Sequence, residues 1–175
     1  MTSALTDTTN KKNKEEEIFD RKLELVTAGL RPQFYSTLKS KLKKENAKII
    51  IDYILAMKTE INLSDYHRES IIKLLDLFCC SNDKNLKEVT REDILEFLDR
   101  RRKPESSDPL HRWIGTYNSY LAILSKFFKW LYYPDIGPHK IPRPPAVENI
   151  TQIKRKEQSI YTAGDMWTVE DDFLF

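Results

Sequence analysis

The residues from Asp108 to Tyr133 constrain the fold more than any other part of the chain. Asp108 suits the N-cap of a helix, and Pro109 suits the first helical position. Apolar side chains then recur at every third or fourth position, namely Leu110, Ile114, Tyr117, Leu121, Leu124, Phe128 and Leu131. Because an α-helix turns once in about 3.6 residues, this spacing predicts one long helix that begins at Asp108 and buries a broad apolar stripe.

The opposite face of this predicted helix combines cations with small side chains and contains no acid. Its residues are His111, Arg112, Gly115, Asn118, Ser119, Ala122, Ser125, Lys126 and Lys129, and no Asp or Glu occurs between Leu110 and Tyr133. Glycine costs a helix about 1 kcal/mol relative to alanine, so Gly115 needs a reason. Close approach of the helix to a polyanion is one reason. The alternative is a buried helix in which Gly115 packs against a neighbour.

Charge is distributed unevenly along the chain. The net charge is +2, yet residues 100–156 hold 12 Lys and Arg against four Asp and Glu. Residues 157–175 hold five acidic residues and no basic one. A basic stretch confined to one third of a chain is typical of a nucleic-acid surface, although an acidic protein partner fits the charge as well.

The rest of the chain also reads as helical. Residues 1–14 are polar and without periodicity, which predicts disorder, and a helix over 15–28 should stop near Gly29. Further helices are expected from Pro32 to Glu45, from about Ala47 to Asn62, after a Ser64 cap, and after a Thr90 capping box. No stretch alternates with a period of two residues, so the predicted fold class is all-α.

Several classes of protein are excluded by composition. The chain contains no run of about 18 apolar residues, and its start lacks the apolar core of a signal peptide, so we expect a cytoplasmic protein without membrane contact. The adjacent Cys79 and Cys80 lack metal-ligand spacing and are expected to be a reduced pair. The three histidines are isolated from one another, so no metal site and no cofactor is expected.

Two stretches resemble one known family. TREDILEFLDRRRKPESSDPLHRWIGTYNSYLAILSKFFKWLYYPDIGP resembles the SAM-like core-binding domain of tyrosine recombinases, the phage integrase family, and is most similar to archaeal integrases. KRKEQSIYTAGDMWTVEDDFLF resembles the linker strand and first helix of the catalytic domain in that family. The resemblance spans roughly residues 41–175 and is most specific from Glu88 to Pro138.

The resemblance implies a division into four parts. Residues 1–40 are an N-terminal extension, disordered and then helical, and 41–134 are a SAM-like domain of four to five helices that binds DNA. Residues 135–160 are a basic, proline-rich extended linker, and 161–175 are the truncated start of a catalytic domain. In the family the helical domain and the catalytic domain clamp opposite faces of the duplex, and two helices of the small domain approach the major groove.

The resemblance also implies which residues contact DNA and which chemistry is missing. By position, the DNA-facing candidates are Arg112, Thr116, Asn118, Ser119, Lys126 and Lys129, followed by Lys140, Arg143, Lys154, Arg155 and Lys156 in the linker, with Arg68 and Lys73 as second-rank candidates. No His-x-x-Arg is present and no tyrosine matches the position of the nucleophile, so we expect no catalytic residue and no enzymatic activity from this chain.

Double-stranded DNA is therefore the expected partner, with full-length recombinase protomers as a further candidate and no small-molecule substrate. The expected role is DNA integration and site-specific recombination. Two alternatives remain open: a helical protein-interaction module that has kept the fold and lost DNA, and a DNA-binding regulator of the helix-turn-helix kind that has lost recombinase activity.

Overall fold

The computed structural model describes residues 3–134, 136 and 140–154, with side chains from residue 13 onward. Within these ranges the secondary structure is entirely helical, which confirms the predicted all-α class. The α-helices are α1 (Ser3–Thr27), α2 (Pro32–Ser36), α3 (Lys44–Ile61), α4 (Asp65–Ser81), α5 (Arg91–Asp99) and α6 (Trp113–Tyr132). A π-helical turn (Thr37–Lys41) follows α2, and 3-10 turns cover Leu86–Glu88 and Pro145–Val147.

One hydrophobic core joins all six helices. Tyr53 of α3, Phe78 of α4, Phe97 of α5 and Phe127 and Phe128 of α6 are almost completely buried. Their rings meet edge to face, with centroids 5.1 Å apart for Tyr53 and Phe127 and for Phe78 and Phe97. Such aromatic pairs add about 0.5–1.5 kcal/mol each to the free energy of burial. The long helix α6 therefore lies at the centre of the packing, as its apolar stripe predicts.

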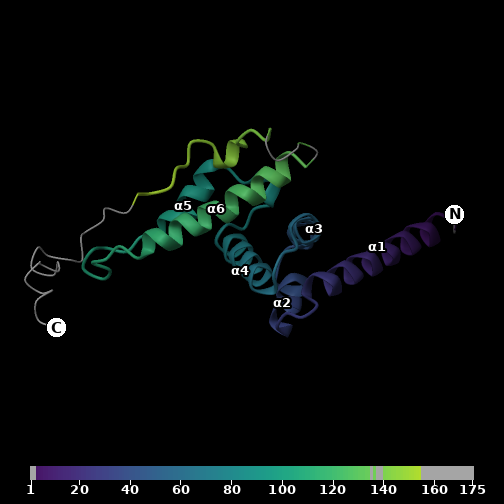
Figure 1. Ribbon diagram of the computed structural model, residues 1–175. Helices are drawn as coiled ribbons and strands as arrows, with labels where there is room; N and C mark the ends of the chain where they lie inside the picture. The colour runs from purple at the N-terminus through teal and green to yellow at the C-terminus, as the bar shows by residue number, and fades with distance from the viewer. Residues whose placement is uncertain (1–2, 135, 137–139, 155–175) are drawn as a thin grey trace, which may run out of the picture.

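Helix α1 differs from its prediction. It begins at Ser3, although residues 1–14 were expected to be disordered and the helix to start at residue 15. Residues 3–14 contain three lysines but no glutamate, and their threonines and asparagines have low helix propensity, so the sequence gives no signal for this part of the helix. Only the second half of α1 enters the core, through Phe19, Leu23 and Val26, and the first half projects away from the other helices (Figure 1). The predicted stop near Gly29 is confirmed, with φ +79° at this residue.

The predicted helix Pro32–Glu45 is broken. It consists of α2 and the π-helical turn, and Leu42 (φ −89°, ψ 153°) is extended before α3 begins. The other local signals are confirmed: α3 ends at a left-handed Asn62, and the Ser64 hydroxyl accepts a hydrogen bond from the His67 N–H at 3.4 Å.

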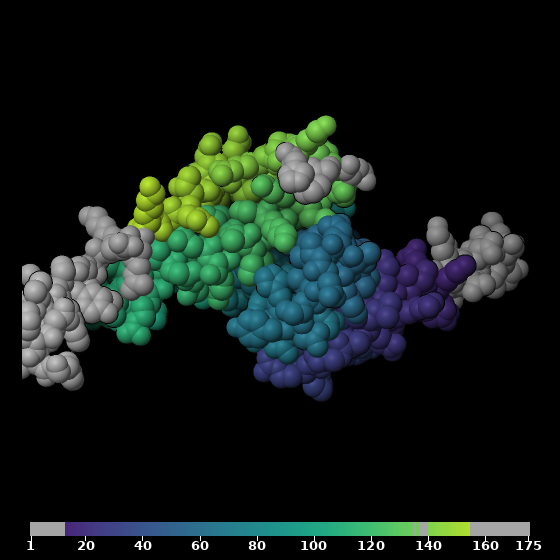
Figure 2. Space-filling model, in the orientation of Figure 1, coloured from purple at the N-terminus to yellow at the C-terminus, as the bar shows by residue number. Residues whose placement is uncertain are grey.

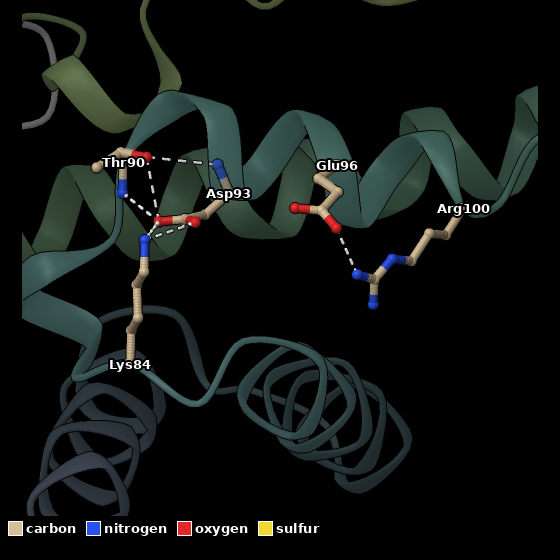
Figure 3. A network of polar contacts seen from close by, with 5 residues as sticks. All are labelled: Lys84, Thr90, Asp93, Glu96 and Arg100. Carbon is tan, nitrogen blue, oxygen red and sulfur yellow. Dashed lines mark hydrogen bonds and ion pairs between the residues drawn. The ribbon is translucent and has the colours of Figure 1, made fainter.

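The Thr90 capping box is also present and anchors α5 (Figure 3). The Thr90 N–H donates to Asp93 Oδ2 at 2.9 Å, and Lys84 Nζ donates to both carboxylate oxygens of Asp93 at 2.9 Å. Burial raises the pKa of Asp93, but the hydrogen bonds from Lys84 and Thr90 outweigh it and hold this pKa below its ordinary value. The carboxylate thus ties the loop after α4 to the start of α5.

Helix α6 begins later than predicted, at Trp113 instead of directly after Asp108. His111 has φ +47°, in the left-handed region, and such a residue interrupts a right-handed helix. The N-cap is Arg112 and not Asp108 as predicted, although Asp108 Oδ2 accepts a hydrogen bond from the Trp113 N–H at 2.9 Å. Leu110, predicted on the apolar stripe, lies before the helix and is exposed. Phe127, which the predicted stripe omitted, is fully buried.

Residues 140–154, here called the return segment, run back along α6 (Figures 1 and 2). Ala146, Val147 and Ile150 are buried in the common core. The Arg91 Nε of α5 donates to the Glu148 carbonyl at 2.9 Å. This part of the predicted linker is extended apart from one 3-10 turn, but it is packed on α5 and α6 and is no free tether.

Candidate nucleic-acid interface

The outer face of α6 is open to solvent. Gly115, Thr116, Ser119, Ala122 and Lys126 are exposed, and Lys129 is half-exposed. A Cβ atom placed on Gly115 would meet no described heavy atom within 4 Å. The alternative in which Gly115 packs against a neighbour within the chain is therefore wrong for the described structure. The cationic face predicted from the sequence is a real surface.

Arg112 lies at the N-cap of α6 rather than inside the helix. Its side chain is 78% exposed, and its Nε is 4.0 Å from Asp108 Oδ1, the longest ion pair among those of the described residues. Asp108 itself is held by the Trp113 N–H, which is the main reason that its pKa lies below the ordinary value. If the Arg112 guanidinium turns toward a partner, the buried Asp108 carboxylate keeps its hydrogen bond from the Trp113 N–H.

Asn118 has a structural role that the sequence did not reveal. Its Nδ2 donates to the Ile153 carbonyl and its Oδ1 accepts from the Ile153 N–H, both at 2.9 Å. The Asn118 side-chain amide therefore pairs with the Ile153 backbone as another peptide group would, and it attaches the return segment to α6. Because one Nδ2 donor and the Oδ1 acceptor are already used, the expectation that Asn118 faces DNA is corrected.

The cations of α6 and the return segment lack acidic partners. Within the described residues, no carboxylate lies within 4.0 Å of five side chains that share this surface, Lys126, Lys129, Lys140, Arg143 and Lys154. Lys140, Arg143 and Lys154 are exposed, and Arg143 lines the same hollow of the surface as Lys129. Arg155 and Lys156, predicted to continue this set, and the predicted start of a catalytic domain at 161–175 lie outside the described residues.

Cations elsewhere are mostly neutralised. Lys41 bonds to Asp76 at 2.6 Å, Arg31 to Glu69 at 2.7 Å, and Lys84 to Asp93 at 2.9 Å. In such an ion pair the carboxylate cancels most of the positive potential of the cation, so a second anion is attracted only weakly. The cations of α6 and the return segment differ from these pairs, although Lys48 and Lys58 of α3 are also without an ion pair among the described residues.

The second-rank candidates on α4 are not available in this way. Arg68 is only 4% exposed, and it donates to the carbonyls of Val26 at 2.8 Å and Ala28 at 3.0 Å and to the Asp65 carboxylate. The expectation that Arg68 contacts DNA is wrong, because this side chain is buried and caps the C-terminal carbonyls of α1. Lys73 is exposed but lies 3.7 Å from Glu69.

Other chemistry is not assembled in the described structure. Among those residues no group of three or more His, Cys, Asp and Glu side chains is arranged to hold a metal ion. Cys79 and Cys80 are both free thiols, as expected, and burial raises the pKa of Cys79 to about 12. None of the helices described combines the length and apolar content that crossing a bilayer requires.

The site therefore consists of one open cationic surface on α6 and the return segment, with Asn118 holding the two together. Comparisons of the chain with protein-family models, with curated proteins and with solved structures found no match.

Proposed function

We propose that this chain binds double-stranded DNA through the outer face of α6 and the cations of the return segment. The observation that carries the proposal is the set of five cations without a carboxylate within 4.0 Å in the described structure. Binding a duplex releases the counterions condensed on its phosphates, and each cation that contacts a phosphate contributes to this release. Cations already paired with carboxylates contribute much less.

The role that fits this surface is that of the DNA-binding half of a tyrosine recombinase, and this chain takes part in recombination without cleaving DNA itself. The all-helical fold is compatible with the SAM-like core-binding domain that the sequence resembles. In that arrangement α6 is the main helix at the duplex. Helix α4 contributes less, since Arg68 is buried and Glu69 is tied to Arg31.

Phosphate contacts of this kind give affinity and position without reading sequence. Thr116 and Ser119 are exposed on the same face as Lys126 and have no described hydrogen-bond partner for their hydroxyls. Gly115 adds no side chain to the outer face of the first turn of α6, which allows a phosphate backbone to approach closely. These small residues therefore complement the cations on the proposed surface.

The test compares two double variants that change the net charge equally. Lys126→Glu with Lys129→Glu places two acids on the proposed surface. Lys48→Glu with Lys58→Glu places two acids on exposed positions of α3, where neither lysine has a described ion pair. Fluorescence anisotropy with a labelled duplex measures affinity, and far-UV circular dichroism reports whether each variant is folded.

We expect the α6 variant to lose duplex affinity by at least about tenfold, because two phosphate contacts are replaced by repulsion, with helicity unchanged. The α3 variant should lose much less. Equal losses in the two variants would show that only net charge matters, and an unchanged affinity of the α6 variant would show that α6 is not the docking face. If the unmodified chain fails to bind any duplex at low salt, the protein-interaction module becomes the better assignment.

A further inference from the structure

The hollow between α6 and the return segment, here called the seam groove, is lined by donors. Its volume is about 320 Å³. Ser125 and Lys129 face it from α6, and Arg143, Thr151 and Gln152 face it from the return segment. Its floor is formed by buried apolar side chains of both elements. The groove exists only because the two elements are docked on one another.

The chemistry of this lining is one-sided. Two side chains are cationic, three carry a hydroxyl or amide donor, and no carboxylate lines the groove. None of the five makes a side-chain hydrogen bond or an ion pair with another described residue. Five donor-bearing side chains that line one groove, with no carboxylate among them, suit the binding of an oxyanion.

Size agrees with this chemistry. A volume of about 320 Å³ corresponds to roughly ten water molecules, so a tetrahedral oxyanion fits together with part of its hydration shell. Ala122, an exposed residue of the lining, adds only a methyl group. A flat aromatic base would find no stacking ring there, because none of the lining residues is aromatic.

We infer that the seam groove binds one phosphate group between α6 and the return segment. Given the proposed function, on which this second step rests, the group is a phosphodiester of the duplex backbone. Lys129 approaches it from the helix and Arg143 from the return segment, and Ser125, Thr151 and Gln152 supply neutral donors. The groove is thus a clamp in which two segments distant in sequence grip the same phosphate.

The inference assigns Asn118 a positioning role. Its two hydrogen bonds to the Ile153 backbone hold the return segment beside α6 next to Gln152. Asn118→Ala removes no charge, yet it frees the segment that carries Arg143. Loss of this one neutral amide should therefore weaken phosphate binding as replacement of the cations does.

The first experiment uses inorganic phosphate, added at constant ionic strength in exchange for chloride. Amide chemical shifts of Ser125, Thr151 and Gln152 are followed in the full chain. We expect saturable chemical-shift changes in the unmodified protein and in the control double variant Lys48→Gln with Lys58→Gln. The double variant Lys129→Gln with Arg143→Gln, which removes the same charge from the groove, should show no saturable change. Shifts scattered over all lysine-bearing segments, or unchanged by the groove variant, would overturn the inference.

The second experiment separates a backbone phosphate from a free one. The logarithm of duplex affinity falls with the logarithm of salt concentration by about 0.9 per phosphate contacted. Two variants are compared, the double variant Lys129→Gln with Arg143→Gln and the single variant Asn118→Ala. Each should reduce the magnitude of this slope by about 0.9, and circular dichroism confirms that both are folded.

An unchanged slope in a groove variant that no longer binds inorganic phosphate would refute the backbone assignment. Absence of duplex binding by the unmodified chain would refute the proposed function, whereas the phosphate titration would still decide the groove.

Discussion

Arg68 offers the sharpest test of the packing in this structure. Its guanidinium lies almost entirely inside the protein and donates to the carbonyls of Val26 and Ala28 and to Asp65. These carbonyls belong to the end of α1, where the last carbonyls of a helix lack partners within the helix. A cation at this position also interacts favourably with the negative end of the helix dipole. Arg68→Ala is expected to destabilise the junction of α1 and α4.

The magnitude follows from the bonds lost. A hydrogen bond made by a charged group contributes about 1.5–3 kcal/mol, and the two carbonyls would be left near a new cavity. The desolvation of the guanidinium offsets part of this contribution. We therefore expect a loss of about 3 kcal/mol in the free energy of unfolding, which lowers Tm by roughly 6–12 °C in a chain of this length.

Urea unfolding monitored by far-UV circular dichroism measures this loss. Lys73→Ala on the same helix is the matched control, because Lys73 is exposed and its pair with Glu69 is 3.7 Å long. Exposed pairs of this kind contribute about 0–1 kcal/mol, so the control should unfold within about 1 kcal/mol of the unmodified protein. The reasoning is refuted if Arg68→Ala is as stable as Lys73→Ala.

Three further predictions concern single positions. The pKa of Asp93 is lowered in the folded state, so the stability that its carboxylate contributes is present above the unfolded pKa and is lost as the pH falls through the folded pKa. Asp93→Asn should therefore unfold at a lower urea concentration than the unmodified protein at pH 7. This difference in urea midpoint should shrink below about pH 4. A difference that stays constant with pH would contradict it. Gly115→Ala should raise the free energy of unfolding by up to about 1 kcal/mol in urea titrations, because its Cβ meets no described atom, and a destabilised variant would contradict this. Iodoacetamide at neutral pH should label the exposed Cys80 before Cys79, because burial raises the pKa of Cys79 to about 12; mass spectrometry would contradict this order if Cys79 reacted first.

Features set by neighbouring residues were predictable from the sequence. The Ser64 cap, the Thr90 capping box and the end of α3 near Asn62 each depend on a few consecutive residues, and each occurs as expected. The apolar stripe of α6 likewise follows from helical spacing. The start of α6 was missed because the left-handed conformation of His111 has no clear sequence signal.

Features that depend on distant residues were not predictable. Nothing near Asn118 in the sequence indicates that its amide pairs with Ile153, and nothing near Arg68 indicates that it closes the end of α1. For the same reason the groove residues Thr151 and Gln152 were absent from the predicted DNA-facing residues, and Ser125 was predicted only to lie on the outer face of the helix. Exposed cations such as Lys126 and Arg143 were predictable, because charge density is a property of the sequence itself.

The central claim is that unpaired cations on α6 and the return segment contact duplex phosphates, and the salt dependence of duplex binding tests it most directly. If the five cations Lys126, Lys129, Lys140, Arg143 and Lys154 contact three or four phosphates, with Lys129 and Arg143 on the same one, the logarithm of affinity should fall against the logarithm of salt concentration with a slope of about −0.9 per contact, or roughly −2.7 to −3.6 in total. A slope near zero, or no binding at low salt, would contradict the account.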